Sequence, residues 1–295
     1  MKAFKYILFP AGIVFAFGIN ACRKDVNTPQ TIPAAASGPD TSLLAAKTDI
    51  IAESYFDDLA LIGDEASEYA LNSYRSSDPH VNPFCACGGL FFDTLNHSDN
   101  DSVIVNMGLT NCLNTDGRYR RGTLTYIYSG NKHYRDSLNF INVKIDNYFV
   151  DNHSISGTLL ITCLGHINGC MTWKMDVRGT IVLANNGGKV TYNGTRMRRL
   201  IAGEGHNVVN WGMAKIGITG SGSGQCADGT YYSSVITNEI VRDITCIGYY
   251  RFISQGKVDY IPAGRSARHL DFGNDVCDDQ ATITLGASTW LFTMI

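Results

Sequence analysis

The order of apolar and polar positions divides the chain into one helical segment and a much longer segment that alternates with a period of two. Between Thr48 and Arg75, apolar residues recur at steps of three or four. These positions are Ile51, Tyr55, Leu59, Ile62, Ala66 and Tyr69. Acidic residues occupy the other faces, at Glu53, Asp57, Asp58, Asp64, Glu65 and Glu68. The spacing predicts an amphipathic helix over residues 48–76, capped by Thr48 or Asp49.

Two features of this helical segment leave alternatives open. Gly63 lies in its middle, where glycine is about 1 kcal/mol less favourable than alanine, so the segment forms either one helix or two shorter ones. We expect the apolar stripe to pack against the rest of the protein, with the acidic residues on the remaining faces. A helix that binds a separate partner protein is the alternative.

From Phe84 onward, apolar and polar residues alternate. In the clearest stretch, Thr172–Leu183, one face carries Trp173, Met175, Val177, Gly179, Ile181 and Leu183. Turn-forming pairs such as Asp116-Gly117 separate the alternating stretches, and no helical stretch of about ten residues lies between them. The pattern predicts a mainly β domain over residues 84–295. We expect a long antiparallel meander of roughly ten to twelve strands that forms a β-sandwich or an open barrel, with the one N-terminal amphipathic helix packed on it.

Residues 1–21 have the three parts of a secretory signal. Lys2 and Lys5 precede an apolar run over residues 6–19, and the segment ends in I-N-A-C, whose cysteine is Cys22. This tetrapeptide resembles a bacterial lipoprotein box, which implies that Cys22 is acylated and becomes the first residue. An ordinary signal peptide with an incidental cysteine is the alternative. Two or three acyl chains, at about 0.8 kcal/mol per buried CH₂, anchor a protein stably to a bilayer.

Composition supports an exported protein with one large domain. Residues 22–47 contain the acylated cysteine followed by a flexible linker rich in proline, threonine, alanine and serine. The apolar content of 44% and charged content of 17% exclude wholesale disorder. The formal net charge of −3 becomes −5 without the two leader lysines, which argues against nucleic-acid binding. We therefore expect a lipid-anchored protein of the cell envelope, in the outer membrane and facing the periplasm or the surface.

The cysteines point to disulfides, because eight of the nine lie beyond Cys22 in a chain expected to be exported. Cys163 and Cys170 flank residues 164–169, the loop of a predicted hairpin, and we expect them to be bridged. We further predict a Cys246–Cys277 bond and a bond from Cys112 to Cys87 or Cys85. A zinc site built from Cys163, His166 and Cys170 is the alternative.

Four arginines are candidates for a site that binds an anion. Arg118 and Arg120 fall on one face of a predicted strand, and Arg196 and Arg198 precede the stretch Gly203-Glu204-Gly205-His206. Guanidinium groups bind carboxylates and phosphates through paired hydrogen bonds, which suits an anionic ligand. Ion pairing with neighbouring carboxylates along the sheet is the alternative.

An acidic loop near the C-terminus is the weak candidate for a calcium site. Its oxygen-bearing residues are Asp271, Asn274, Asp275, Asp278 and Asp279. Carboxylate and amide oxygens are the ligands that calcium prefers, but this spacing is not that of an EF-hand. A solvated acidic turn is therefore the main interpretation, and we predict no metal.

Sequence motifs of catalysis are missing. The chain has no G-x-S-x-G elbow, no Walker loop and no H-E-x-x-H helix, and its histidines form no i, i+4 pair. We therefore predict no catalytic residues and no cofactor, and expect non-enzymatic binding or scaffolding at the membrane surface. A carrier of a lipid or other apolar ligand in a curved β-sheet is one alternative, and a hydrolase of glycans or esters is another. Besides the membrane, the expected ligand is a glycan, a lipid or an envelope protein.

Several short motifs occur in an order that carries a resemblance. They are ESYFDDL at residues 53–59, NCLNTDGRYRRG at 111–122, RRLIAGEG at 198–205 and RSARHLDFGNDVCDDQATITL at 265–285. Together with the lipobox, they resemble an uncharacterised family of Bacteroidota cell-envelope lipoproteins over most of the chain. The resemblance implies an exported β-rich domain on a lipid tether, and it implies no activity.

Overall fold

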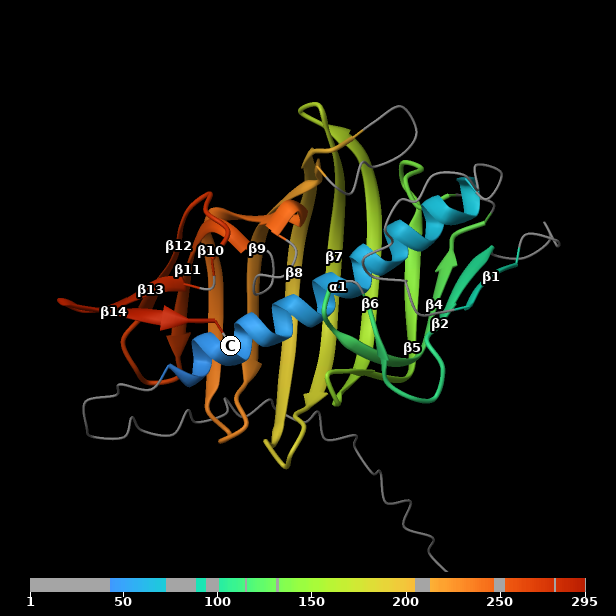
Figure 1. The fold of residues 1–295 in the computed structure, drawn as a ribbon. Coiled ribbons are helices and arrows are strands. Elements are labelled where there is room, and N and C mark those ends of the chain that lie inside the picture. The colour runs from blue at the N-terminus through green and yellow to red at the C-terminus, as the bar shows by residue number, and fades with distance from the viewer. Residues whose placement is uncertain are drawn as a thin grey trace, which may run out of the picture. The chain divides into compact units, whose positions relative to one another are not determined.

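Fourteen antiparallel strands follow one another in a single sheet, and one long helix packs against it (Figure 1). The helix is α1 (Leu44–Asn72). The strands are β1 (Gly89–Asp93), β2 (Ser102–Asn106), β3 (Cys112–Leu113), β4 (Tyr119–Tyr128), β5 (Phe140–Val150), β6 (His153–Ile167), β7 (Cys170–Val182), β8 (Lys189–Ala202), β9 (Lys215–Gln225), β10 (Tyr231–Asp243), β11 (Ile253–Pro262), β12 (Arg268–Asn274), β13 (Gln280–Leu285) and β14 (Ser288–Thr293). A 3₁₀ helix, η2 (Ile244–Cys246), follows β10.

This computed structural model describes residues 43–72, 89–93, 101–114, 116–130, 133–204, 213–246, 253–278 and 280–294. The predicted signal sequence, Cys22 and the linker up to residue 42 lie outside this part of the chain. The end of the predicted helical segment beyond Asn72 also lies outside it. The lipid anchor therefore stays a prediction.

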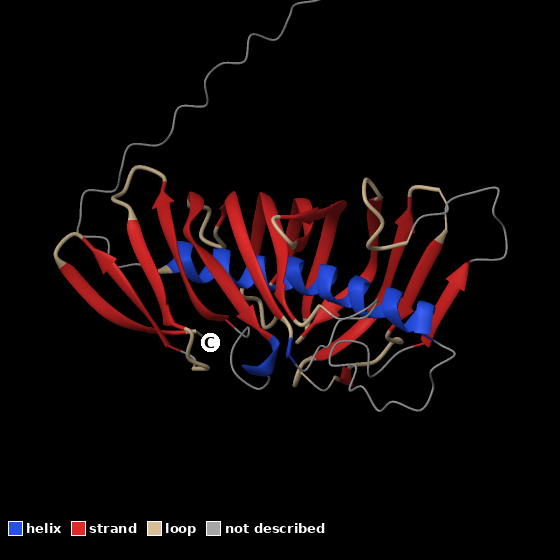
Figure 2. Cartoon of the chain, turned by 90° about the horizontal axis from the view of Figure 1, so that it is seen from above, coloured by secondary structure: helices blue, strands red, loops and turns tan. Residues whose placement is uncertain are grey.

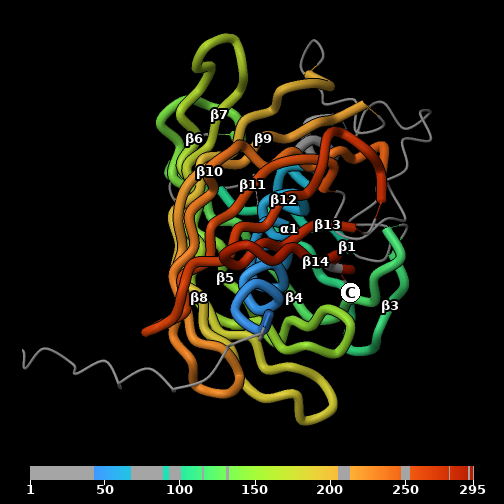
Figure 3. Tube along the Cα trace, turned by 90° about the vertical axis from the view of Figure 1, so that its left-hand side faces the viewer, coloured from blue at the N-terminus to red at the C-terminus, as the bar shows by residue number. Residues whose placement is uncertain are grey.

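The sheet is an open meander with a helix as its second layer. Each strand pairs with its neighbours along the chain, except that β2 pairs with β4 and the short β3 pairs with β4 alone. Within the described residues β1 and β14 form the two edges and do not pair with each other. The sheet bends around α1 (Figures 2 and 3). We call the side that faces α1 the inner face and the opposite side the outer face.

The predicted antiparallel β meander with one N-terminal helix packed on it is confirmed. Of the two expected forms, the described strands make one open, curved sheet rather than a sandwich of two sheets, and α1 covers its inner face. The helix contacts β2, β6, β8, β9, β10 and β11, so it crosses most of the sheet. A helix of 29 residues is long enough, at about 1.5 Å per residue, to bury an apolar face that spans many strands.

Alternation along the strands builds the core between the sheet and α1. In β7 the inner positions Trp173, Met175, Val177 and Ile181 are buried, as the period of two predicts. They join Tyr55, Phe56, Leu59 and Ile62 of α1 in one apolar cluster. Gly179 occupies an inner position directly below Phe56, whose ring fills the space that a Cβ would need. The strand thus lacks a side chain where the helix approaches most closely.

Gly63 does not break the helix, because the structure has one continuous helix through this position. A Cβ on residue 63 would lie 2.7 Å from Cδ1 of Tyr126, far inside the normal contact distance. The Tyr126 hydroxyl donates a hydrogen bond of 2.6 Å to the Leu59 carbonyl oxygen, which holds the ring over the glycine. The helix therefore tolerates the low propensity of glycine in exchange for close packing against β4.

The predicted Cys163–Cys170 disulfide is wrong, since both thiols are free. The hairpin turn consists only of Asn168 and Gly169, both with positive φ, rather than the loop of residues 164–169. With this short turn Cys170 lies opposite Ile167, and Cys163 lies opposite Trp173. The two cysteines are therefore three register positions apart and cannot be bridged.

The predicted Cys246–Cys277 disulfide is present, with a Cα–Cα distance of 5.3 Å, and it joins η2 to the loop before β13. Cys112 is also disulfide-bonded. Its predicted partners, Cys85 and Cys87, lie outside the described residues, so that pairing stays a prediction.

Replacing Gly63 with alanine tests the close packing of α1 on β4. Alanine has the higher helix propensity, by about 1 kcal/mol, but its methyl group collides with the Tyr126 ring. We expect Gly63→Ala to lower the free energy of unfolding by about 1–3 kcal/mol in urea denaturation. In a Tyr126→Ala background the collision is absent, and the same change should raise stability. Destabilisation of equal size in both backgrounds would contradict the packing argument.

Candidate functional site

The acidic side of α1 is buried together with its apolar side. We expected the acidic residues to face away from the sheet, but Asp57, Asp58, Asp64 and Glu65 are all no more than 2% exposed. The curved sheet encloses the helix closely enough that a second face of it lies against strands. Buried carboxylates need ionic or hydrogen-bonding partners, and the inner face of the sheet supplies arginines.

Two of these arginines come from β4 and the turn that precedes it. Arg120 is fully buried and donates two hydrogen bonds to Asp116, of 2.7 Å from Nη1 and 2.5 Å from Nη2. Its Nη2 also lies 3.3 Å from Oδ2 of Asp58 on α1. Arg118 donates to the same Asp58 oxygen, and its guanidinium lies 4.8 Å from the centre of the Tyr55 ring. One helix carboxylate thus joins two arginines of the sheet.

Two further arginines come from β8 and contact Glu53 and Asp57 of the helix. Arg196 donates from Nε to Oε2 of Glu53 at 2.6 Å, and the Tyr192 hydroxyl donates to the same oxygen at 2.7 Å. Arg198 lies two residues further along the strand, and its Nε is 2.9 Å from Oδ1 of Asp57. This last pair is an ion pair without hydrogen-bond geometry.

Arg242 on β10 completes the network and is the residue that sequence analysis missed. It donates to Asp57 from Nη1 and to Oδ1 of Asp58 from Nη2, the latter at 3.0 Å. It is therefore the one cation that contacts both adjacent helix carboxylates among the described ion pairs. Alternation from the buried Tyr232 and Ser234 gives Arg242 an inner position, and this signal was available in the sequence.

The arginines hold the central carboxylate in its charged form. Burial disfavours ionised Asp58, but Arg118, Arg242 and Arg120 outweigh this effect and keep its pKa below the usual value. Asp49, two turns earlier on α1, is in the opposite situation. Burial raises the pKa of Asp49 to about 7, and Arg196 opposes this only in part. Ser234 Oγ donates to Oδ1 of Asp49 at 3.0 Å.

The four arginines predicted to bind an external anion contact carboxylates of the same chain instead. All four predicted arginines lie on the inner face, and each forms an ion pair with a carboxylate of α1: Arg118, Arg120, Arg196 and Arg198. Ion pairing along the sheet, the alternative interpretation, describes what they do. The anionic groups that these side chains bind are carboxylates of α1 in the same chain.

The residues named for the alternative calcium and zinc sites have the following surroundings in the described part of the chain. Asp271 binds Lys257, Asp275 binds Lys215, and Asp278 accepts a hydrogen bond from the Gln280 amide. Asp271, Asp275 and Asp278 thus each have a partner among the described residues, and Asp279 lies outside them. No group of three acidic, histidine or cysteine residues suited to a metal occurs in the described ranges, which include Asn274, Cys163, His166 and Cys170.

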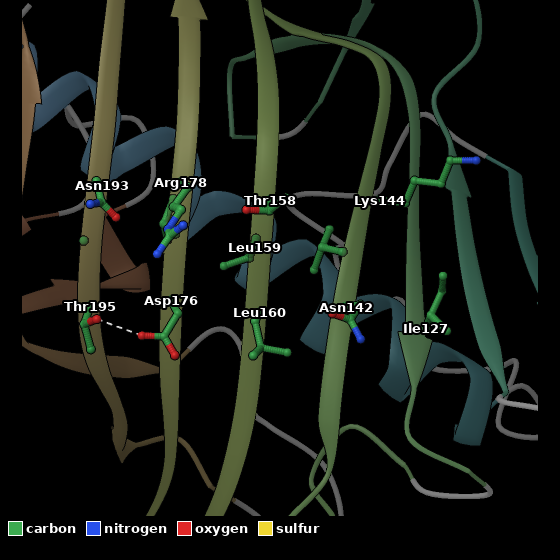
Figure 4. A pocket seen from close by; sticks show the side chains of 13 residues that line it. Ile127, Asn142, Lys144, Thr158, Leu159, Leu160, Asp176, Arg178, Asn193 and Thr195 are labelled. Atoms are coloured by element: carbon green, nitrogen blue, oxygen red, sulfur yellow. Dashed lines mark hydrogen bonds between the residues drawn. The ribbon is translucent and has the colours of Figure 1, made fainter. Parts of the chain in front are cut away.

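The outer face of the sheet carries a different feature, an open groove of about 410 Å³ across β4 to β8. The side chains in Figure 4 project from these strands on the side away from α1, which lies behind the sheet. Polar residues dominate the lining, namely Asn142, Lys144, Thr158, Asp176, Arg178, Asn193 and Thr195. Ile127 and Leu160 add apolar surface. Five neighbouring strands hold the whole lining on a hydrogen-bonded frame.

Charges in the groove are unbalanced. Asp176 accepts hydrogen bonds from Lys174 and from the Thr195 hydroxyl, both at 2.7 Å, and these contacts lower its pKa although burial opposes them. Lys144 and Arg178 form no ion pair within the described part of the chain. The groove therefore presents two unpaired cations among amide and hydroxyl groups. No sequence motif indicates this groove, because its residues are separated along the chain and meet only through strand pairing.

The two alternative functions are a carrier of an apolar ligand and a hydrolase. The contents of the inner face concern the first, and the contacts of the histidines concern the second. An apolar ligand would need space between sheet and helix, but Phe56, Leu59 and their neighbours on α1 occupy the inner face. His166 contacts Glu204 at 2.8 Å, and His269 contacts Asp259 at 2.7 Å. Within the described residues neither ring bonds a serine, threonine or cysteine, so a hydrolase stays a hypothesis without assigned residues.

Comparison with known proteins adds no identity to this geometry. No family model, no curated protein and no solved structure matches the chain. Among the described residues, no helix has both the length and the apolar character that a membrane-spanning helix needs. The resemblance to envelope lipoproteins therefore stays a prediction.

Asp58→Asn tests whether the ionic network holds α1 in the sheet. The change leaves Arg118, Arg120 and Arg242 without their shared carboxylate, and loss of one partner of a buried ion pair costs about 3–5 kcal/mol. The matched control is Asp176→Asn on the outer face, where an exposed pair contributes at most about 1 kcal/mol. Urea denaturation followed by circular dichroism measures both. Equal losses would contradict the special role of the inner face.

Asp49→Asn tests the pH dependence that the buried carboxyl introduces. Because folding raises the pKa of Asp49 from 3.8 to about 7, its contribution to stability is complete below about pH 4 and is lost as the pH rises through 7. Between pH 5 and pH 8, we expect the wild type to lose stability relative to Asp49→Asn. Burial lowers the pKa of His153, and this opposing effect cancels because both proteins share it. Parallel stability curves would contradict the prediction.

Proposed function

We propose that this protein is an exported, lipid-anchored envelope protein that binds an acidic oligosaccharide in the groove on the outer face of its sheet. The observation that carries the proposal is a pair of cations, Lys144 and Arg178, which form no ion pair within the described residues, in a groove whose one carboxylate, Asp176, is already bound by Lys174 and Thr195. The binding is non-enzymatic, and the sheet acts as a rigid platform.

The chemistry of the lining suits a charged sugar. Asn142, Asn193 and Thr158 offer hydrogen-bond donors and acceptors that match sugar hydroxyls. Arg178 lies directly opposite Asn193 across the β7–β8 pair, so a cation and an amide face the same part of a ligand. A guanidinium binds a carboxylate through two parallel hydrogen bonds, which gives preference to acidic over neutral sugars. Leu160 offers apolar surface for the C–H face of a sugar ring.

The proposed location follows from the leader and from cysteine chemistry. The lipobox-like ending at Cys22 supports acylation and attachment to a membrane, and the sequence before it supports export. The Cys246–Cys277 bond is of a kind that persists in oxidising compartments, which supports the cell envelope.

Binding of oligogalacturonate, a carboxylated oligosaccharide, tests the proposed function by isothermal titration calorimetry. We expect Arg178→Ala and Lys144→Ala each to weaken binding about tenfold, equivalent to roughly 1.4 kcal/mol. Lys189→Ala is the matched control, because Lys189 is an exposed cation of β8 outside the groove. A neutral oligosaccharide of the same length should bind much more weakly. Failure of oligogalacturonate to bind, or equal effects of all three variants, would overturn the proposal.

A further inference from the structure

The last strand of the sheet has a free edge and exposed side chains. β14 pairs with β13 on one side, and no strand of the described residues pairs with its other side. Figure 1 shows it at one end of the sheet, near the C-terminus. Trp290 is 41% exposed and Leu291 is 63% exposed, on opposite faces of the strand. The edge thus presents unpaired backbone groups between exposed apolar side chains.

This edge lacks the features that protect edge strands in natural proteins. Charged side chains, prolines and bulges normally prevent such a strand from pairing with another chain. Residues 280–294 contain no charged residue and no proline, although 17% of the whole chain is charged. The pairing of β13 with β14 runs without a register shift, so no bulge twists the edge away. The free backbone edge of β14 can therefore form hydrogen bonds with another strand.

We propose that a second copy of this chain pairs with β14 in antiparallel register and forms a two-fold symmetric dimer. With the axis perpendicular to the sheet, residues that face each other must lie on the same face, so the axis passes midway between one residue and its own copy on the other strand. Centring it on Leu291 places Leu291 opposite Leu291, and Thr289 opposite Thr293 of the second copy. Leucine meets leucine and threonine meets threonine, pairs that stabilise antiparallel sheets.

The absence of charge on the strand favours an identical partner. Two copies of a charged edge would place like charges opposite each other, but β14 has none to repel its own copy. The other sheet edge, β1, ends in Asp93. Pairing of β14 with β1 of another copy would be heterologous and would continue into a polymer, whereas pairing of β14 with itself closes as a dimer.

Charge placed on the edge tests the proposal. Sedimentation equilibrium of the full chain in density-matched detergent should show a concentration-dependent dimer for the wild type and a monomer for Leu291→Lys. The control is Val276→Lys, because Val276 is also exposed, at 57%, but lies in the loop before β13. Circular dichroism shows that each variant is folded. A wild type that stays monomeric up to about 100 µM, or that forms polymers, would overturn the inference.

Cysteine cross-linking tests the register itself. Leu291→Cys should form an intermolecular disulfide, because opposed residues of antiparallel strands lie about 4.5–5.5 Å apart. Thr289→Cys is the matched control on the same face. In the proposed register it lies four residues, or about 13 Å, from its own copy, beyond the reach of a disulfide. Both are made with Cys170→Ser, which removes a partly exposed thiol. Cross-linking of Thr289→Cys as strongly as Leu291→Cys would overturn the register.

Discussion

Charged side chains that are cut off from water must find partners, and this requirement binds α1 to the sheet. Asp57 and Asp58 are nearly inaccessible to solvent, and their partner Arg242 lies 184 or more residues away along the chain. Neither side can be buried alone, because an unpaired ion in a protein interior costs several kcal/mol. The buried charges of the helix and of the inner face therefore find their partners only when the two pack together. The helix is thus an integral part of the domain.

The ionic contacts also explain how a helix finds one position on so wide a sheet. Apolar packing alone is non-directional, and an aliphatic helix could slide or rotate over many strands at little cost. Glu53 meets Arg196 on β8, whereas Asp58 meets Arg120 on β4, so the two carboxylates select different strands about one and a half turns apart. We infer that the network sets the direction and rotation of α1, a role in specificity that buried ion pairs have in other proteins.

Periodicity predicted the elements well and their environments less well. Steps of three and four identified the helix, and alternation identified the buried residues of β7, because both patterns follow from local backbone geometry. The amphipathic argument assumed that an acidic face needs water, and it could not show that arginines of β4, β8 and β10 would replace the water. The Cys163–Cys170 bond failed for a local reason, since Asn168-Gly169 is a signal for a two-residue turn and fixes a different register. No pattern in the sequence indicated the groove, because its residues come from five different strands.

The two faces and the free edge of the sheet have different roles in the proposed dimer. The inner face holds the helix, which leaves the outer face of the central strands, including Lys144 and Arg178, rigid and open to solvent. In the proposed dimer, a two-fold axis between the two copies of Leu291 and perpendicular to the sheet keeps the outer faces of both copies on the same side. Two grooves would then face one polymeric ligand. A chain with repeated acidic sugars would contact both grooves of the proposed dimer, and because the second contact is intramolecular, two weak sites would combine into tighter binding.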